Sequence, residues 1–488
     1  MRPARFAHLV FCLFGILALS LQLSPKLAAQ AGLDAATERL RKTAGLERAH
    51  LGIAVLDVAT GATVASLNDS RSLVPASLMK VTTTATALEV LGGEYRFETQ
   101  LCHSGEVVDG TLRGDLVIVG GGDPSLGAGR PAGAPELDAL LDRWADAVTR
   151  AGIRRIEGRV LGDESLDPGA EPSPYWQWND IGNYYGAGVG ALMIHENQYT
   201  LRLRRTPEVG GRPQIVGYAP DPGELRWVNE LRSGAAGSGD QSFIFGAPGT
   251  YDRVIRGTIP AGKGTYEVEG SLPEPARHAA DWLTEVLEGR GIAVSGEAAA
   301  SRAGVRSSYP VLDAYRSPPL RELIELTNFR SVNVFAEAIY AALGRKLGAG
   351  DDDPAAVGEA IVEYWAGRGL DAEGFEQVDG SGLGMRNMIT PRQLASVLRL
   401  SARAGSGLAA TLPRVGAEGT VRSVLRGRAS AARIRAKSGT LKRARGFCGY
   451  ATAADGRELA FVVLANNYTG SGRALRRAMG TWMEALVE

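Results

Sequence analysis

An α+β fold is predicted by the sequence, with an antiparallel sheet flanked by helices and a large, mostly β insertion. Two hairpin patterns support the sheet, one near each end of the chain, at residues 50–68 and 446–466. Each hairpin precedes a helical pattern, so both ends of the chain are expected to build one domain. The segment between them, from about residue 97 to 297, has a different texture of short strands and turns. A chain of 488 residues also exceeds one ordinary core.

The chain opens with a pattern typical of a secretory signal peptide. Two arginines precede an apolar run from about Ala7 to Leu23, and small residues follow around Ala29 and Ala31. We therefore expect residues 1–31 to be removed and the mature protein to be secreted or periplasmic. An uncleaved membrane anchor is the alternative, although the run is near the short end for a span. Peripheral association with the membrane or the cell wall stays open.

Charge and cysteine content limit the possible partners. Loss of the leader removes three basic and no acidic residues from a chain of formal charge +0, which leaves −3. Such a balance does not suit a polyanion, so no nucleic-acid partner is expected. Cys102 and Cys448 remain in a chain bound for an oxidising compartment and could form a bridge. Separate buried thiols are favoured, because the two cysteines fall in different expected domains.

The elements near the N-terminus form a hairpin and a helix. Residues 50–59 and 62–68 alternate apolar and polar side chains around Gly61. Helical spacing of apolar residues follows from 77 to 91, and two glycines at 92 and 93 mark its end.

Local sequence patterns also predict elements in the insertion and in the C-terminal part. Residues 114–118 read as a short strand, and the glycine-rich run at 120–124 reads as a turn, because it lacks the spacing of a phosphate-binding loop. Strands at 446–453 and 458–466 flank an Asp-Gly turn, and an amphipathic helix is expected at 473–486.

Four consecutive residues, Ser77-Leu78-Met79-Lys80, carry the strongest chemical signal. Residues three apart on a helix share a face, so Lys80 can take the proton of Ser77 if its amine is kept neutral. Ser77 is the only serine of the chain with a lysine three positions later. Taken alone, the pattern is more often an ordinary helix start, so the residues that follow decide its meaning.

Two further motifs follow in the order used by serine acyl-transfer enzymes that handle penicillin-like substrates. They are an S-x-N and a K-[TS]-G motif, and a second S-x-N precedes the nucleophile and is discounted. The scattered histidines give no support to a Ser-His-Asp hydrolase, and no metal-binding pattern occurs, so neither a metal nor a cofactor is expected. The motif residues are Ser331, Asn333, Lys437, Ser438, Gly439 and Thr440.

With these motifs the chain resembles the class C low-molecular-weight penicillin-binding proteins, which are D-alanyl-D-alanine carboxypeptidases and endopeptidases of the peptidase S13 type. The resemblance implies a penicillin-binding transpeptidase/β-lactamase-like domain in two parts, residues 32–96 and 298–488, around inserted accessory domains at 97–297. It also implies peptidoglycan peptides as substrates and β-lactam antibiotics as covalent inhibitors. The other matching segments lie at 114–124, 190–197, 317–320, 333–337 and 379–391.

The resemblance assigns a role to each motif residue. Ser77 would attack the peptide carbonyl, and Lys80, with its pKa lowered by burial and by Lys437, would be the base. Ser331 would relay a proton to the leaving D-alanine nitrogen. Asn333 would hold Lys80 and the substrate backbone, because its amide both donates and accepts.

The K-[TS]-G motif is expected to bind the substrate. Lys437 and Thr440 would receive its terminal carboxylate, and the backbone N–H groups of Ser77 and Thr440 would form the oxyanion hole. Ser438 replaces the commoner threonine and keeps the hydroxyl. Gly439 would leave room for the substrate strand.

One departure from the family pattern concerns the substrate side chain. Where the family usually has Ser-Arg, this chain has Gly384-Met385, with Arg386 one place later. The preference for a particular diamino acid is therefore open at Met385. Asp180 is a further candidate, as a carboxylate for a substrate amine.

Two other classes of protein stay open at this stage. A serine β-lactamase or esterase would share the acylation chemistry but would release the acyl group quickly. A non-catalytic wall-binding scaffold would keep the fold, although three intact motifs argue against it.

Overall fold

The computed structural model describes residues 25–166, 172–303, 309–349 and 353–488. The predicted signal peptide therefore lies mostly outside the described residues, and only its last part falls in helix α2 (Pro25–Arg41). Within the described ranges, no helix is long and apolar enough to cross a membrane.

A five-stranded antiparallel sheet joins the two ends of the chain, in the order β19-β20-β21-β1-β2. The N-terminal and C-terminal hairpins meet along β1 and β21, whose residues pair from His50 with Asn466 to Asp57 with Leu459. Both predicted hairpins are thus present and share one sheet. The strands are β1 (His50–Asp57), β2 (Thr63–Leu67), β19 (Ile434–Leu441), β20 (Ala444–Thr452) and β21 (Glu458–Asn466).

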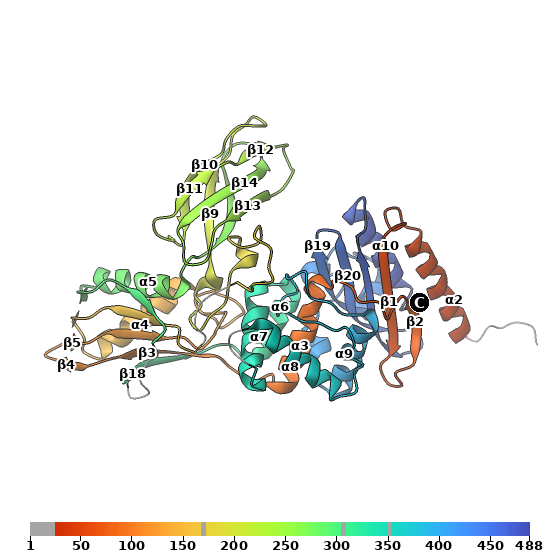
Figure 1. The fold of residues 1–488 in the computed structure, drawn as a ribbon, viewed down its shortest axis with the longest axis horizontal. Coiled ribbons are helices and arrows are strands. Elements are labelled where there is room, and N and C mark those ends of the chain that lie inside the picture. Colours follow the sequence, from red (N-terminus) through yellow and green to blue (C-terminus); the bar gives the residue numbers. More distant parts are fainter. Residues whose placement is uncertain (1–24, 167–171, 304–308, 350–352) are drawn as a thin grey trace, which may run out of the picture.

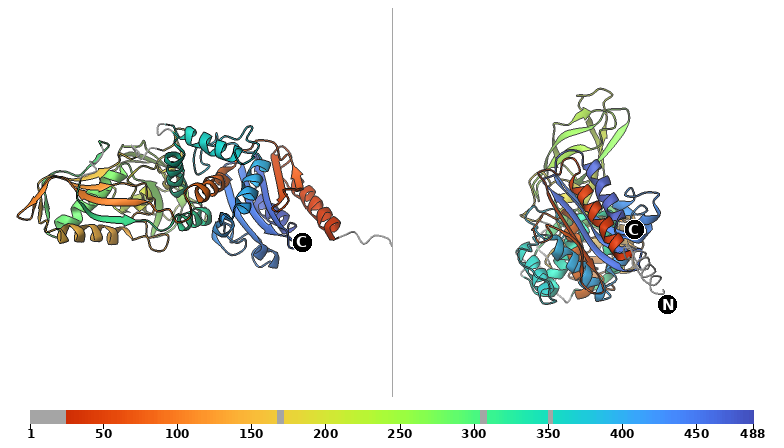
Figure 2. Two further views of the ribbon diagram at one scale, coloured as in Figure 1. Left: turned by 90° about the horizontal axis from the view of Figure 1, so that it is seen from below. Right: turned by 90° about the vertical axis from the view of Figure 1, so that its right-hand side faces the viewer.

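Both faces of this sheet are covered by helices (Figures 1 and 2). Successive side chains of a strand point to opposite faces, so Ala54 joins one buried cluster while Ile53 and Val55 join another. The first cluster includes helix α9 (Pro391–Arg403), and the second includes α2 and α10 (Gly472–Glu484). Strands β1 and β21 are buried on both sides, which explains their nearly continuous apolar sequence.

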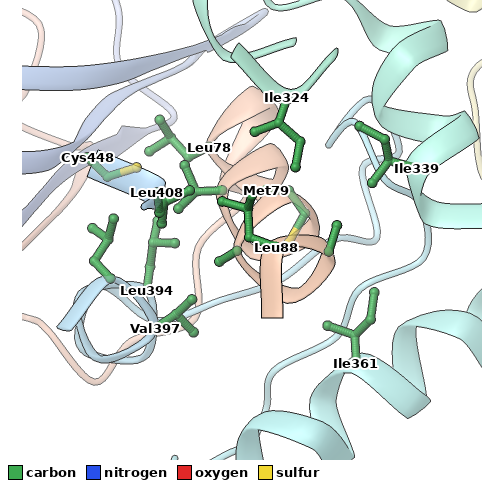
Figure 3. Close-up of a cluster of buried hydrophobic side chains, with 14 of the residues drawn as sticks. Leu78, Met79, Leu88, Ile324, Ile339, Ile361, Leu394, Val397, Leu408 and Cys448 are labelled. Carbon is green, nitrogen blue, oxygen red and sulfur yellow. The ribbon is translucent and has the colours of Figure 1, made fainter. Parts of the chain in front are cut away.

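Helix α3 (Met79–Val90) lies in the middle of this domain, and every residue from Met79 to Leu88 is buried. Apolar side chains from the surrounding helices converge on it, among them Ile324, Ile339 and Ile361 (Figure 3). The predicted helix from 77 to 91 is therefore present, preceded by the short turn η1 (Ala76–Leu78). Its neighbours are α6 (Leu320–Arg330), α7 (Asn333–Leu347) and α8 (Pro354–Ala366), and the turns η4 (Leu408–Thr411), η5 (Gly419–Val421) and η6 (Ala429–Arg433) lead from α9 to β19.

The inserted segment is mostly β, as expected. Two of its sheets pack with helices α4 (Leu137–Arg150) and α5 (Pro275–Gly289), in the strand orders β17-β8-β6-β3-β18 and β16-β7-β5-β4. Trp144 of α4 is fully buried in the shared core. The strands are β3 (Glu98–His103), β4 (Glu106–Val108), β5 (Thr111–Arg113), β6 (Leu116–Val119), β7 (Arg155–Ile156), β8 (Val160–Asp163), β16 (Ala293–Val294), β17 (Ala299–Ser301) and β18 (Val311–Arg316).

Two further sheets form the part that projects upward in Figure 1. One has the order β10-β9-β15, and in the other β14 pairs with β11, β12 and β13. The strands are β9 (Gln198–Arg204), β10 (Gln214–Ala219), β11 (Arg226–Asn229), β12 (Arg232–Gly234), β13 (Gln241–Phe245), β14 (Asp252–Pro260) and β15 (Thr265–Ser271).

The pairing of two strands after residue 297 bears on where the insertion ends. Strand β17 pairs with β8, and β18 pairs with β3, so both belong to an accessory sheet. Strands β17 and β18 are short, and the sequence around them has no clear alternation, so the sequence pattern could not predict this pairing. We propose that the insertion ends near Ser317, just before α6.

The two cysteines of the described chain are free and buried. Cys102 lies in β3 of the accessory sheet, whereas Cys448 lies in β20 of the central sheet. The preference for separate buried thiols is therefore confirmed.

Candidate active site

Ser77 lies in the turn η1, directly before the buried helix α3. Two glycines allow neighbouring segments to approach this turn closely. A Cβ atom on Gly439 would lie 2.7 Å from the Pro75 carbonyl oxygen, and one on Gly382 would lie 2.0 Å from that of Ala76. The nucleophile turn is thus held between strand β19 on one side and the Asp379 turn (residues 379–384) on the other.

This packing changes the reading of Gly439. The sequence predicted that its missing side chain would make room for a substrate strand. Its closest neighbours are instead Pro75 and Leu78 of the nucleophile turn. Glycine is required there because β19 must approach η1 closely enough to bring two motifs together.

The amine of Lys80 is completely buried and has three hydrogen-bond partners. Its Nζ atom lies 3.2 Å from Ser77 Oγ, 2.7 Å from Asn333 Oδ1 and 2.7 Å from the Ser381 carbonyl oxygen. The lysine therefore links the first motif, the second motif and the Asp379 turn. The contact with the serine hydroxyl is the longest of the three.

These partners orient a neutral amine toward the serine. A neutral amine has two N–H groups and one lone pair. The Ser381 carbonyl can only accept, and Asn333 presents its amide oxygen because its Nδ2 donates to the Tyr185 carbonyl oxygen at 2.7 Å. Two N–H groups are therefore taken, and the lone pair faces the hydroxyl of Ser77. This geometry suits proton abstraction from a serine nucleophile.

Burial lowers the pKa of Lys80 to about 8, while the charges of Glu337 and Asp379 oppose that shift. The expected lowering by burial is present, but the expected contribution of Lys437 is not. Burial, assisted by the charge of Lys80, holds the pKa of Lys437 well below its usual range. The charge of Lys437 is not among the causes of the Lys80 shift, whereas the charge of Lys80 contributes to that of Lys437.

Lys437 is paired with the second motif. Its Nζ donates to Ser331 Oγ at 2.8 Å and to the Ser438 carbonyl oxygen at 2.9 Å. Ser331 ends helix α6 in a left-handed conformation with φ of 62°, and α7 begins two residues later at Asn333. The bend between the two helices therefore turns both polar side chains of the motif toward lysines.

The remaining K-[TS]-G residues differ in exposure. Ser438 is nearly buried, and its hydroxyl donates to Thr420 Oγ1 of η5 at 2.8 Å. Thr440 is exposed, on the sheet's edge strand β19. Ser438 thus faces inward, and Thr440 is accessible to a ligand.

A loop of the insertion completes the surroundings. We call residues 172–187 the accessory loop. Besides the Tyr185 carbonyl, it supplies Trp176, whose Nε1 donates to Asp379 Oδ2 at 2.9 Å. Asn183 fastens the loop to β13, because its side chain exchanges hydrogen bonds with the backbone of Ile244.

Asp180 and Met385, the two candidates for contacts with substrate side chains, lie outside the hydrogen-bond network of Lys80. Asp180 is part of the accessory loop, is half-buried, and has a raised pKa because of burial. Met385 follows the Asp379 turn and is 40% exposed. Arg386 points to other partners, since its Nη2 lies 2.5 Å from Glu376 Oε1 and its guanidinium covers the ring of Tyr175.

Several residues at the site were not assigned a role in the chemistry from sequence. Glu337 and Asp379 are fully buried and accept backbone N–H groups of the Asp379 turn. Both had been noted within matching segments, but an isolated Ala-Glu or Asp-Gly pair reads as a helix residue or a turn. No sequence pattern could predict the contacts of Trp176 and Tyr185, because these contacts depend on how the insertion folds back onto the central domain.

A family model for the D-Ala-D-Ala carboxypeptidase 3 (S13) family matches residues 33–486. The chain belongs to this family. The predicted S13 relationship, the α+β fold and the assignment as an enzyme are therefore confirmed. The chain is 31% identical over 449 residues to a D-alanyl-D-alanine carboxypeptidase of Actinomadura sp. (strain R39), covering 87% of this chain and 79% of that protein.

Other relatives agree with the S13 assignment. D-alanyl-D-alanine carboxypeptidase DacB of Haemophilus influenzae is 24% identical over 428 residues, which is 87% of this chain and 86% of that protein. The crystal structure of penicillin-binding protein 4 from Haemophilus influenzae aligns with a TM-score of 0.79 at 21% identity, over 93% of this chain and 99% of the other. The fold of that structure is thus shared over nearly the whole chain.

The packing against η1 predicts a strong effect of Gly382→Ala. Gly382 has φ of +78°, and its added Cβ would meet the Ala76 carbonyl. We expect a thermal destabilisation above the about 1–2 kcal/mol of the left-handed conformation alone, together with slower labelling of Ser77 by a fluorescent penicillin.

Gly456→Ala is the matched control, since Gly456 has φ of +85° but open space around its Cβ position. It should lose stability from the conformation only and keep the wild-type labelling rate. Equal losses of stability and labelling in the two variants would show that the contact with the nucleophile turn is unimportant.

Proposed function

We propose that the protein is a serine D-Ala-D-Ala carboxypeptidase and endopeptidase that acts on peptidoglycan stem peptides and cross-links through an acyl-enzyme at Ser77. The observation that carries this proposal is the buried Lys80 amine, with two acceptors and the Ser77 hydroxyl as its partners. Membership of the S13 family supports the substrate class. We further propose that the mature protein acts outside the cytoplasm, after removal of residues 1–31.

The proposed acylation begins with transfer of the Ser77 proton to Lys80. Ser77 Oγ then bonds to the carbonyl carbon of the penultimate D-alanine, and the backbone N–H groups of Ser77 and Thr440 stabilise the oxyanion. The C–N bond breaks, and the proton that Lys80 took from Ser77 passes through Ser331 to the leaving amine. Water then attacks the ester, its hydroxyl joining the acyl carbon and its proton returning to Ser77.

The substrate carboxylate is assigned to Lys437 and Thr440. Thr440 is accessible at the edge of the sheet, and Lys437 lies three residues before it on the same strand. A carboxylate beside Lys437 would favour the protonated amine. Binding of the C-terminal D-alanine would therefore oppose the lowering of the Lys437 pKa by burial.

A serine β-lactamase or esterase of the same fold is the alternative activity, and a non-catalytic scaffold is the alternative without chemistry. An S13 peptidase should remain acylated by penicillin, whereas a β-lactamase would release the product quickly. A protein of the same fold, penicillin-binding protein 4 from Haemophilus influenzae, has been solved in complex with a β-lactam. This supports the proposal that β-lactams inhibit this chain covalently.

The first prediction tests the nucleophile. Intact mass after incubation with benzylpenicillin should rise by one adduct that persists, and Ser77→Ala should abolish it while keeping the thermal unfolding profile. Ser66→Ala, at an exposed serine of β2, is the control and should label like the wild type. Labelling of Ser77→Ala would disprove the assignment, and rapid loss of the wild-type adduct would favour a β-lactamase.

The second prediction tests carboxylate binding. Lys437→Ala should reduce kcat/KM for substrates with a terminal carboxylate by about 10- to 100-fold more than for uncharged esters, the value of one charge-assisted hydrogen bond. Lys442→Ala, at an exposed lysine in the turn after β19, should leave both unchanged. An equal loss for both substrate types would rule out this role of Lys437.

The third prediction concerns the diamino acid of the stem peptide. Met385 cannot pair with a side-chain carboxylate, and Arg386 is engaged by Glu376 and Tyr175. The wild type should therefore discriminate less than about tenfold between free and amidated side chains, and Met385→Arg should add a preference of about 10- to 100-fold for the free carboxylate.

Met385→Gln, of similar length and without charge, is the control and should behave like the wild type. A wild-type preference above about tenfold that Arg386→Ala abolishes would show instead that Arg386 leaves Glu376 and binds the substrate.

A further inference from the structure

Two buried carboxyl groups hold the Asp379 turn beneath the active site. Glu337 Oε2 accepts the Gly380 N–H at 2.9 Å, and Oε1 accepts the Ser381 N–H at 2.8 Å. Asp379 accepts the N–H groups of Gly382 and Gly384 at 2.7 and 2.6 Å. Four of the turn's backbone donors thus end on two side chains that are at least 94% buried.

The peptide group held by Glu337 is also the one that contacts Lys80. Glu337 binds the N–H of Ser381, and the carbonyl of the same residue accepts from Lys80 Nζ at 2.7 Å. The preceding carbonyl, that of Gly380, accepts from Thr83 Oγ1 of α3 at 2.9 Å. Glu337 itself projects from α7, one helical turn after Asn333. One helix therefore carries two of the groups that fix the lysine.

We propose that Glu337 is a positioning residue for Lys80: it holds the Ser381 carbonyl against the amine and supplies a negative charge that favours the protonated lysine. This inference rests on the proposed function, because it assigns Lys80 as the base for Ser77. It adds a group that touches neither substrate nor nucleophile but controls when the base is available.

The proton affinities of Glu337 and Lys80 are linked, because each charge stabilises the other. Burial raises the pKa of Glu337 to about 8, with Asp379 adding to the shift and Lys80 opposing it. The groups that face it are Lys80 from α3, Asp379 from the turn and Tyr340 from its own helix, and burial keeps Tyr340 neutral by raising its pKa. Lys437 of β19 also interacts with Lys80, whose charge contributes to the lowered pKa of Lys437.

The sign of the pH effect follows from these charges. The base must be neutral, so acylation should rise as the pH increases through the pKa of Lys80, which is about 8. The carboxylate of Glu337 raises the pKa of Lys80. The acid limb is the part of the pH profile in which the acylation rate rises with pH. Removal of the Glu337 charge should therefore move this acid limb to lower pH.

The test is the second-order rate of labelling by a fluorescent penicillin from pH 5 to 10. Glu337→Gln keeps the shape but removes the charge, so its acid limb should lie about one pH unit below that of the wild type, the low end of the effect of a neighbouring charge. An unchanged limb, or one shifted to higher pH, would overturn the proposal.

Two further variants separate position from charge. Glu337→Asp keeps the charge but is shorter, so it should keep the wild-type limb while its maximal rate falls at least tenfold, as expected when a base is misplaced. If Glu337→Gln does not fold, this variant decides: a limb shifted to lower pH despite the retained charge would contradict the proposal. Asp123→Asn is the control, because it removes a buried carboxyl group of the accessory part. The pH of its acid limb and its maximal labelling rate should match those of the wild type.

The same assay separates this inference from the proposed function. A wild type that is never labelled at Ser77 would overturn the proposed function itself. A wild type that is labelled, with an acid limb that Glu337→Gln does not move, would overturn only the role of Glu337.

Discussion

The structure depends on one constraint, which is the placement of a lysine amine in a dry interior where every N–H must find an acceptor. A charged amine would be costly there without partners, and a neutral one would be poorly directed. Lys80 avoids both problems, because Asn333 and Ser381 accept two of its N–H groups and the remaining position on the nitrogen faces Ser77. The burial of α3, the bend between α6 and α7 and the close packing of the Asp379 turn all serve this arrangement.

The insertion contributes to the same arrangement from outside the central domain. Its accessory loop fixes the amide of Asn333 through the Tyr185 carbonyl and bonds to Asp379 through Trp176. Asn183 anchors this loop to β13 of the projecting sheets. The accessory part therefore bonds to Asn333, a partner of the base, and to Asp379. Changes in its loop should reach the chemistry through the orientation of the Asn333 amide rather than through direct contact.

The sequence could predict much of the central domain because its signals are local. The hairpin patterns that contain β1 and β20, the helical spacing of α3 and the three motifs each follow from short-range rules. The sequence predicts that the insertion ends at residue 297. The pairing of β18 with β3, more than two hundred positions away, supports the later end that we propose. Glu337, Trp176 and the neighbours of Gly439 could not be assigned from local signals. Their roles arise from contacts between segments that only the fold brings together.

The proton affinity of Lys80 is the most direct test of this account. Selective isotope labelling of the few lysines, with Lys80→Arg to assign the signal, allows NMR to follow the Cε shift of Lys80 as the pH is raised. The account predicts a midpoint at about 8, well below the ordinary value of 10.5. A midpoint near 10.5 in the folded protein would mean that the amine is charged throughout the neutral range, and Lys80 could not then be the base that activates Ser77.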